Sequence, residues 1–384
     1  MKKKILYNLP LSPLGMGCYG IGGAYGIKDE YLMREILQLA YQLGVRYFDT
    51  ADQYGNAEEI LGQAVQPFRQ KITIASKVGL GKNNQPDLSR EHIISSCENS
   101  LMRLKTDYLD LYQVHYDDPD TPISETIATL ELLKKEGKIR YYGIGHLPRE
   151  VSKGYLAKGN ISTIMAEMNA ATTQRYRELH PLQSEYNFGI IPFSITGRGL
   201  LTGKIDQNTQ FDAQDIRRHD PFFNRAKLQS GLRIVDKLKE LGQECGKSPV
   251  QMAIGWVLAQ EGVLTALTGP TKKDHLRENL KIMNWKMEES LITELNLFLE
   301  VEEKRLASRV NEEINTILSS KLDPNLEQAV ADLIYVMENL AERGKLDSKE
   351  IISYYQKVMK IYKSNDVKTQ HLVEVQQALQ SQSF

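Results

Sequence analysis

The sequence has few cysteines and no long hydrophobic run, and both absences narrow what the chain can be. Its three cysteines, Cys18, Cys97 and Cys245, are odd in number and far apart, so they predict neither a disulfide framework nor a zinc site. No segment approaches the roughly 20 consecutive apolar residues of a membrane-spanning helix. The start of the chain also has no apolar run long enough for a signal peptide. We therefore expect a cytoplasmic protein with no membrane partner.

An excess of positive charge is also lacking. The chain has 48 Lys and Arg against 49 Asp and Glu, a net charge of −1, which argues against an electrostatic nucleic-acid binder. No GxGxxG signature follows a first strand and opens a helix, and no P-loop lysine motif is present, so the dinucleotide-binding fold and phosphoryl transfer lose support. No His-x-His pair or carboxylate cluster stands at a strand end. A metal-dependent barrel hydrolase is therefore disfavoured.

Short apolar runs alternate with longer stretches of helical period through about residue 285 of the 384. Strands that alternate with helices predict a parallel sheet, and eight strands suit the closed eight-fold barrel. The expected strands are Gly15–Cys18, Tyr47–Asp49, Ile72–Ser76, Leu109–His115, Tyr141–Gly145, Thr163–Met168, Gly189–Phe193 and Leu264–Leu267. The expected helices between them are Glu30–Leu43, Ala57–Gln66, Arg90–Leu104, Ile123–Glu136, Arg149–Ala157 and Gln174–Tyr186. The predicted fold class is α/β, a (β/α)8 TIM barrel.

Two regions break this alternation. Residues 194–232 show no clear period, and a long irregular insert in a compact domain is usually functional. After about residue 285 the strands stop, and Glu288–Ser320, Pro324–Arg343, Ser348–Lys363 and Val367–Gln380 all read as helices. We therefore divide the chain into a barrel over residues 1–304 and a helical appendage over residues 305–384.

Four polar residues stand at or just beyond the carboxyl ends of successive expected strands. Asp49 and Lys77 end or close two apolar runs, His115 ends a third, and Tyr54 lies five residues after Asp49. Reduction of a carbonyl by hydride places negative charge on oxygen, so it requires a proton donor and nearby positive charge. A tyrosine is a poor acid near neutral pH, but an adjacent lysine favours the phenolate and is expected to lower the tyrosine pKa. A carboxylate keeps that lysine charged, and a neutral histidine can orient the substrate oxygen.

The order and spacing of these four residues resemble the aldo-keto reductase family, in particular its bacterial and potassium-channel-β-like branch. The resemblance covers about residues 10–300 and implies that Asp49, Tyr54, Lys77 and His115 are catalytic. It places Phe193 flat against a nicotinamide, with the Gly-rich run from Gly197 to Gly203 and then Lys204 near the pyrophosphate. The segment from Gly269 to Asn279 resembles the family's adenosine-phosphate segment. The implied cofactor is NADPH or NADP⁺, with NADH as an alternative.

The chain departs from the family pattern at the expected cofactor contacts. Gly145-His146 replaces the usual Ser-Asn, and Glu167, followed by Asn169, replaces the usual Gln. His146 and Glu167 can still donate to and accept from a nicotinamide carboxamide. A Glu167 carboxylate close to the nicotinamide should also favour the oxidised, cationic ring over the reduced one. His275 stands where many members have an arginine, with Lys272 and Lys273 as substitutes that lack the bidentate fork.

These features predict an NAD(P)H-dependent oxidoreductase that interconverts an aldehyde or ketone with the alcohol, with Tyr54 as general acid and base. The alternative is a regulatory or binding protein that senses the cofactor with weak or no turnover. The expected partner is a small-molecule carbonyl substrate. For the appendage three roles are open: dimer contact, a cover over the active-site mouth, or docking of a partner protein. A homodimer through the C-terminal helices is favoured, because apolar residues recur there at helical spacing and symmetric dimers are common.

Overall fold

The computed structural model describes residues 6, 8–26, 28–212, 215–342, 345–363 and 369–383. Eight parallel strands follow one another in the order β7-β6-β5-β4-β3-β2-β1-β8. The strands are β1 (Leu14–Gly17), β2 (Tyr47–Asp49), β3 (Thr73–Val78), β4 (Leu109–Val114), β5 (Ile139–Ile144), β6 (Thr163–Glu167), β7 (Gly189–Phe193) and β8 (Ala266–Thr268). The two ends of this sheet meet, because a parallel bridge joins Ile190 in β7 to Val263 just before β8. The predicted (β/α)8 barrel is confirmed.

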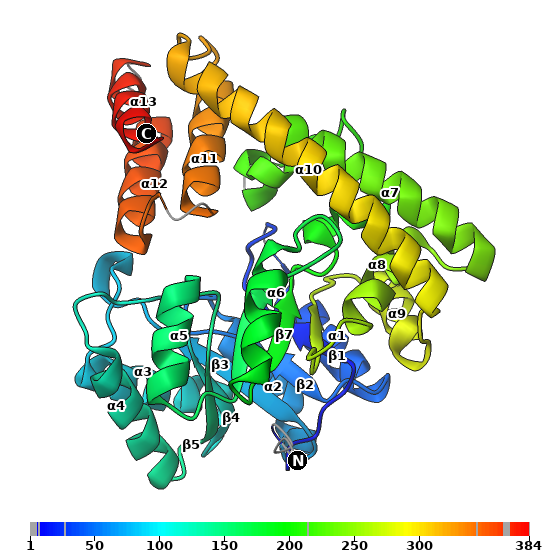
Figure 1. The fold of residues 1–384 in the computed structure, drawn as a ribbon. Helices are drawn as coiled ribbons and strands as arrows, with labels where there is room; N and C mark the ends of the chain where they lie inside the picture. The colour runs from blue at the N-terminus through cyan, green and yellow to red at the C-terminus, as the bar shows by residue number, and fades with distance from the viewer. Residues whose placement is uncertain are drawn as a thin grey trace.

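Helices connect the strands around the outside of the barrel (Figure 1). They are α1 (Glu30–Gln42), α2 (Ala57–Val65), α3 (Arg90–Leu104), α4 (Ile123–Lys135), α5 (Arg149–Lys158), α6 (Gln174–Leu179), α7 (Arg225–Cys245), α8 (Pro249–Leu258) and α9 (Lys273–Leu280). The first of them shows why the chain folds this way. Asp29 caps α1 by accepting from the Leu32 N–H, and its buried residues Met33, Ile36, Leu37 and Ala40 recur at spacings of three and four. One apolar face of the helix therefore packs against the barrel.

The barrel interior is filled by side chains rather than left open. Each of the strands β2, β3, β4, β6, β7 and β8 contributes one member to a small apolar cluster: Tyr47, Ala75, Leu111, Met165, Ile191 and Leu267. Such inward layers are what a closed parallel barrel requires. The packed interior leaves the strand ends as the place where polar side chains can gather.

Two predictions need correction, one of an irregular stretch and one of a helix. The irregular stretch expected over residues 194–232 is too long, because α7 begins at Arg225. The three 3-10 turns η4 (Gly197–Thr202), η5 (Ile216–His219) and η6 (Pro221–Phe223) lie before it. The helix expected over Gln174–Tyr186 ends at Leu179 and continues as the 3-10 turn η3 (His180–Ser184), because Pro181 lacks the N–H that an α-helix needs.

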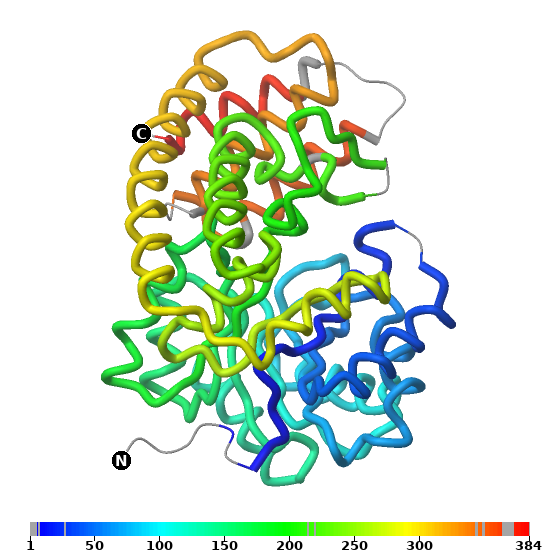
Figure 2. The backbone as a smooth tube through the Cα atoms, turned by 90° about the vertical axis from the view of Figure 1, so that its right-hand side faces the viewer, coloured from blue at the N-terminus to red at the C-terminus, as the bar shows by residue number. Residues whose placement is uncertain are grey.

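The C-terminal appendage is built from α10 (Glu289–Ser319), α11 (Leu326–Glu342), α12 (Ser348–Lys363) and α13 (Thr369–Ser383). The backbone tube places these helices together on one side of the barrel (Figure 2). Helix α10 is continuous across the predicted boundary at residues 304 and 305. Its side chains change partners there, because Leu299 belongs to the barrel core and Val310 to a second apolar core. The division into two units remains a prediction, and α10 is shared between the two cores.

The second core buries most of the apolar positions expected for the appendage. Ala329, Leu333, Val336, Met337 and Leu340 are each no more than 2% exposed within the single chain. Ala226 at the start of α7 belongs to the same core. The homodimer was argued from exposed apolar faces, and the face of α11 is covered inside the protomer. The α11 face therefore gives no support to the predicted homodimer, which depends on the remaining exposed positions of the appendage.

Candidate active site

The four residues predicted to be catalytic come from three adjacent strands. Asp49 is the last residue of β2, Lys77 is the penultimate residue of β3, and His115 directly follows β4. Asp49 pairs in register with Ala75, two residues before Lys77, and Lys77 pairs with Gln113, two residues before His115. Tyr54 lies in the turn between β2 and α2. Parallel pairing therefore brings all four side chains to the carboxyl end of the barrel.

Asp49 and Lys77 form a buried ion pair. Lys77 Nζ lies 2.5 Å from Asp49 Oδ1 and also donates to the Thr50 carbonyl oxygen at 2.6 Å. The two side chains are only 3% and 1% exposed, respectively. Burial raises the pKa of Asp49 above its usual value, and the Lys77 charge acts in the opposite direction. The pair holds an ammonium group inside the barrel mouth.

Tyr54 lies against this ammonium group. Lys77 Nζ is 4.8 Å from the centre of the Tyr54 ring. Burial, followed by the Asp49 charge, raises the pKa of Tyr54 well above 10. The net pKa of this phenol is therefore raised, because burial disfavours the phenolate, and the lowering contribution of Lys77 remains a prediction. Tyr54 is held in its neutral form, which carries a proton to donate.

His115 faces Tyr54 edge to face. The two ring centres are 5.7 Å apart and the rings are inclined by 77°. Burial and the charge of Lys77 lower the pKa of His115 well below 6.5. Its Nδ1 is buried and has no hydrogen-bond partner among the described residues. The expected neutral histidine is therefore present beside the expected proton donor.

Tyr19 is a neighbour of Tyr54 that sequence reasoning missed. It lies two residues beyond the end of β1, and its ring centre is 5.0 Å from that of Tyr54. The side chain is 41% exposed, so it forms part of the rim of the site. Its position just after the first strand, where β2, β3 and β4 also carry polar residues, is the signal that could have identified it.

The expected nicotinamide contacts gather at the ends of β6 and β7. Glu167 pairs in register with Phe193. The ring of His146, just after β5, stands 5.7 Å from the Phe193 ring at 89°, and its Nδ1 accepts from the Glu167 N–H at 3.3 Å. Asn169 instead serves the local turn, since it accepts from the Ala171 N–H and donates to the Ser194 carbonyl. Thus His146, Glu167 and Phe193 are brought together, and Asn169 stabilises the loop beside them.

Glu167 is paired rather than free. Arg198 Nη2 lies 3.1 Å from the Glu167 carboxylate, and Arg198 Nη1 lies 2.5 Å from Asp220. Burial disfavours the Arg198 charge, but Glu167 and Asp220 outweigh burial and raise its pKa. Arg198 has a positive φ of 54° within the Gly-rich turn, so the turn is shaped to direct this guanidinium. Sequence reasoning missed the pair, because nothing in the spacing of residues 167 and 198 indicates contact.

The expected phosphate contacts divide into two groups. Lys204 Nζ lies 3.3 Å from His275 Nε2, and burial together with Lys204 and Lys272 lowers the pKa of that histidine. Lys273 instead forms an ion pair with Glu35 of α1 at 2.9 Å. Lys204, Lys272 and His275 therefore remain as candidate phosphate ligands, whereas Lys273 is occupied by Glu35.

Across the described ranges of the chain, two kinds of feature are absent. No group of three or more His, Cys, Asp or Glu side chains there is arranged to hold a metal ion. No helix in these ranges combines the length and apolar character needed to cross a membrane.

Comparison with known proteins matches most of the chain to one family. The model of the aldo/keto reductase family matches residues 13–300. Aldo-keto reductase YhdN of Bacillus subtilis is 34% identical over 76% of this chain and 91% of its own length. An NADH-specific methylglyoxal reductase of Escherichia coli is 29% identical over 72% of this chain and 91% of its own length. The sequence matches end near the point where the barrel core gives way to the core of the appendage.

Solved structures give the same fold. The glycerol dehydrogenase AKR11B4 of Gluconobacter oxydans superposes with a TM-score of 0.67 at 27% identity, covering 83% of this chain and 96% of the other. The holo form of aldo-keto reductase AKR11C1 of Bacillus halodurans gives 0.62 at 30% identity, covering 74% of this chain and 91% of the other.

Proposed function

The chain belongs to the aldo/keto reductase family, and from that premise we propose that it is an NAD(P)H-dependent oxidoreductase of small carbonyl compounds and alcohols. The observation that carries this proposal is the set of contacts at the barrel mouth. A buried Asp49–Lys77 pair supports a neutral tyrosine, and a neutral histidine faces that tyrosine. A cofactor sensor without turnover has no need of this complete set.

Each of the four residues has a distinct task in carbonyl reduction. Tyr54 donates its phenolic proton to the carbonyl oxygen, and it takes the proton back in alcohol oxidation. Lys77 supplies positive charge beside the phenolate that remains, and Asp49 keeps Lys77 charged despite burial. Neutral His115 orients the substrate oxygen towards Tyr54.

The residues around β6 and β7 fit a nicotinamide dinucleotide. Phe193 offers an aromatic face for the nicotinamide, and His146 and Glu167 offer a donor and an acceptor for its carboxamide. Backbone N–H groups of the turn from Gly197 to Gly203, with Lys204 and Lys272, suit the phosphates. The reduced cofactor supplies the hydride when bound. We favour NADPH because of these lysines, with NADH as the alternative used by the Escherichia coli relative.

Steady-state assays of the Tyr54→Phe variant test the proposal. With NADPH or NADH for a carbonyl panel that includes methylglyoxal, and with NADP⁺ or NAD⁺ for glycerol, we expect the wild-type chain to turn over at least one substrate. Tyr54→Phe should lower kcat by roughly 10²–10⁴-fold, because one acid catalyst is lost. Cofactor affinity, followed by nucleotide fluorescence, should stay within about twofold, since the ring and its packing remain.

Tyr19→Phe is the matched control, because it removes a neighbouring phenol and should retain turnover. Loss of activity in Tyr19→Phe together with full activity in Tyr54→Phe would show that Tyr19, and not Tyr54, is the proton donor. A wild-type chain that binds cofactor and reduces no member of the panel would favour the sensing role instead.

A further inference from the structure

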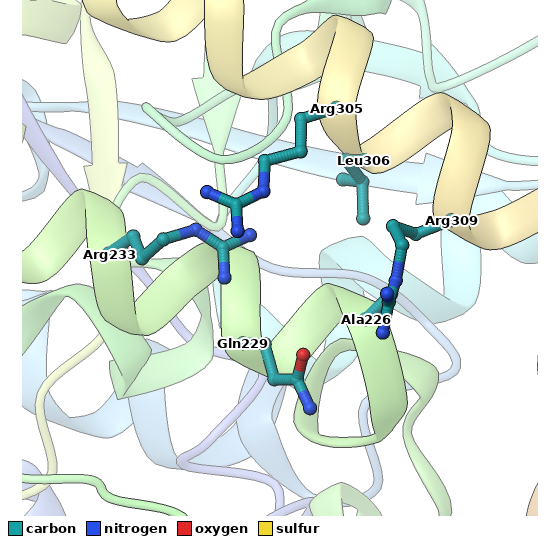
Figure 3. A pocket seen from close by; sticks show the side chains of 6 residues that line it. All are labelled: Ala226, Gln229, Arg233, Arg305, Leu306 and Arg309. Atoms are coloured by element: carbon teal, nitrogen blue, oxygen red, sulfur yellow. The ribbon is translucent and has the colours of Figure 1, made fainter.

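A small cavity lies between α7 and α10, away from the four catalytic candidates. Its volume is about 90 Å³, and three of its lining residues are arginines (Figure 3). The lining residues are Ala226, Gln229 and Arg233 of α7 and Arg305, Leu306 and Arg309 of α10. Because α10 links the barrel to the appendage, the cavity is located where the two units join.

The cavity carries an excess of positive charge. Arg233 is paired with Glu302 at 2.5 Å. In contrast, Arg305 and Arg309 form no ion pair or side-chain hydrogen bond with any residue that the structure describes, and both are exposed. These two arginines are four residues apart on α10, a spacing at which like charges repel each other. In Figure 3 the side chains of Arg233 and Arg305 extend toward one another from the two helices.

Nearby carboxylates do not neutralise the positive charge of Arg305 and Arg309. Glu302 is engaged by Arg233, through three contacts of 2.5–3.1 Å. Glu313 accepts from the N–H of the lining residue Ala226 at 3.3 Å and from the Tyr335 hydroxyl at 2.7 Å. Glu302 therefore offsets the charge of Arg233, and Arg305 and Arg309 have no carboxylate partner among the residues that the structure describes.

We propose that this cavity is a binding site for a phosphate-type oxyanion. Guanidinium groups match phosphate oxygens bidentately, and Gln229 adds an amide donor. A water molecule takes about 30 Å³ of liquid, so the cavity suits a group of a few heavy atoms, such as one phosphate. Leu306 and Ala226 form an apolar floor, while the exposure of Gln229, Arg305 and Arg309 leaves room for the rest of a phosphate ester in solvent. The bound anion links α7 to α10.

Titration calorimetry on the full-length chain tests the site. NADPH is kept saturating throughout, so that phosphate cannot bind through the candidate cofactor ligands Lys204 and Lys272. We expect one equivalent of inorganic phosphate to bind to the wild type. Arg305→Gln combined with Arg309→Gln should weaken binding by about tenfold or more, since the charge-assisted hydrogen bonds of both guanidinium groups to the anion are lost. Lys304→Gln removes one charge from the same helix outside the cavity and should change affinity less than about twofold.

A second titration with glycerol phosphate separates two sources of the same group. Tighter binding of the ester than of inorganic phosphate indicates an organic phosphate ligand, and equal or weaker binding indicates free phosphate. Undiminished phosphate binding in the double variant overturns the proposal, as does the absence of binding to the wild type. If the double variant does not fold, phenylglyoxal labelling of the wild type replaces it. Phosphate should then protect Arg305 and Arg309, and unchanged labelling overturns the proposal.

Discussion

At the scale of single residues, the buried Asp49–Lys77 pair should contribute to the stability of the fold. Lys77→Met should lower the free energy of unfolding by about 3–5 kcal/mol, because Asp49 is left as an uncompensated buried charge. Adding Asp49→Leu should recover most of that loss, since the pair is then replaced by apolar groups. Urea denaturation measures both effects. The double variant should stay inactive, and an undiminished stability of Lys77→Met would contradict the pairing described here.

The shifted pKa values of Tyr54 and His115 predict a flat pH profile. The tyrosine pKa lies well above 10, so its proton is retained at all lower pH values. The histidine pKa lies well below 6.5, so the ring is neutral at all higher pH values. Neither group therefore changes charge between these limits, and single-turnover carbonyl reduction should vary by less than about twofold from pH 6.5 to 9.5. A decline with a midpoint below pH 9 would mean that Lys77 lowers the tyrosine pKa after all.

The Glu167–Arg198 pair changes what is expected of Glu167→Gln. A free carboxylate would stabilise the oxidised cofactor, but Arg198 at 3.1 Å offsets that charge. We expect the ratio of NADP⁺ to NADPH affinity to change by less than about threefold, while both affinities fall because Arg198 loses a partner. Fluorescence titration of both cofactor forms measures the ratio. Asp220→Asn, which removes the other partner of Arg198, is the matched control and should give the same pattern. A tenfold fall in the ratio for Glu167→Gln alone would restore the direct electrostatic role.

The sequence predicted which four residues lie together at the barrel mouth, but it did not predict the raised pKa of Tyr54. Asp49, Tyr54, Lys77 and His115 each follow a strand of clear hydrophobic pattern, so parallel pairing is enough to bring them together. The pKa of Tyr54 depends on how deeply the phenol is buried, and linear spacing carries no such information. Arg198 likewise pairs with residues 31 positions before and 22 positions after it. Only the path of the chain after β7 creates those contacts.

At the scale of elements, α11 holds the loop that follows β7. Arg218 of η5 bonds to Glu327 through two contacts, and Arg225 at the start of α7 bonds to Asp332 at 2.6 and 2.8 Å. Removing both carboxylates, as Glu327→Gln with Asp332→Asn, should loosen this loop and speed NADPH release by about five- to tenfold, a loss of about 1–1.4 kcal/mol. Stopped-flow displacement of bound NADPH measures the rate.

Glu312→Gln is the control for this pair of substitutions. Glu312 is an exposed carboxylate on α10 that makes no ion pair with a described residue, so its loss should leave the release rate within about twofold. An unchanged release rate in the double variant would mean that α11 does not restrain the cofactor loop.

Element boundaries were predictable where periodicity was strong. The expected ranges of β2, β7 and α3 match the structure at both ends. The start of α7 was missed because Pro221-Phe222-Phe223 forms a 3-10 turn directly before it, so the apolar period begins only after a bend. The contacts of the appendage with η5 and with the start of α7 were not predictable, since tertiary pairs between residues 107 or 109 positions apart leave no local pattern.

At the scale of the whole molecule, the second apolar core bears on assembly. The α11 face is buried within the protomer, whereas Tyr355 of α12 remains 47% exposed. We expect multi-angle light scattering to report the mass of a single 43.7 kDa chain, because the apolar faces that favoured a dimer are mostly satisfied internally. A doubled mass that reverts in a Tyr355→Lys variant would show a homodimer through α12.

Helix α10 is unbroken, so a change in its tilt at one end moves the other end. Its 31 residues, at a rise of 1.5 Å each, give a rod about 46 Å long with one end in each core. If the helix moves as one rigid body, a tilt of about 5° at the barrel end displaces the far end by about 4 Å. A change of packing near Leu295 and Leu299 would therefore be larger at the far end of α10, unless the pairs of Arg218 with Glu327 and of Arg225 with Asp332 hold the appendage in place.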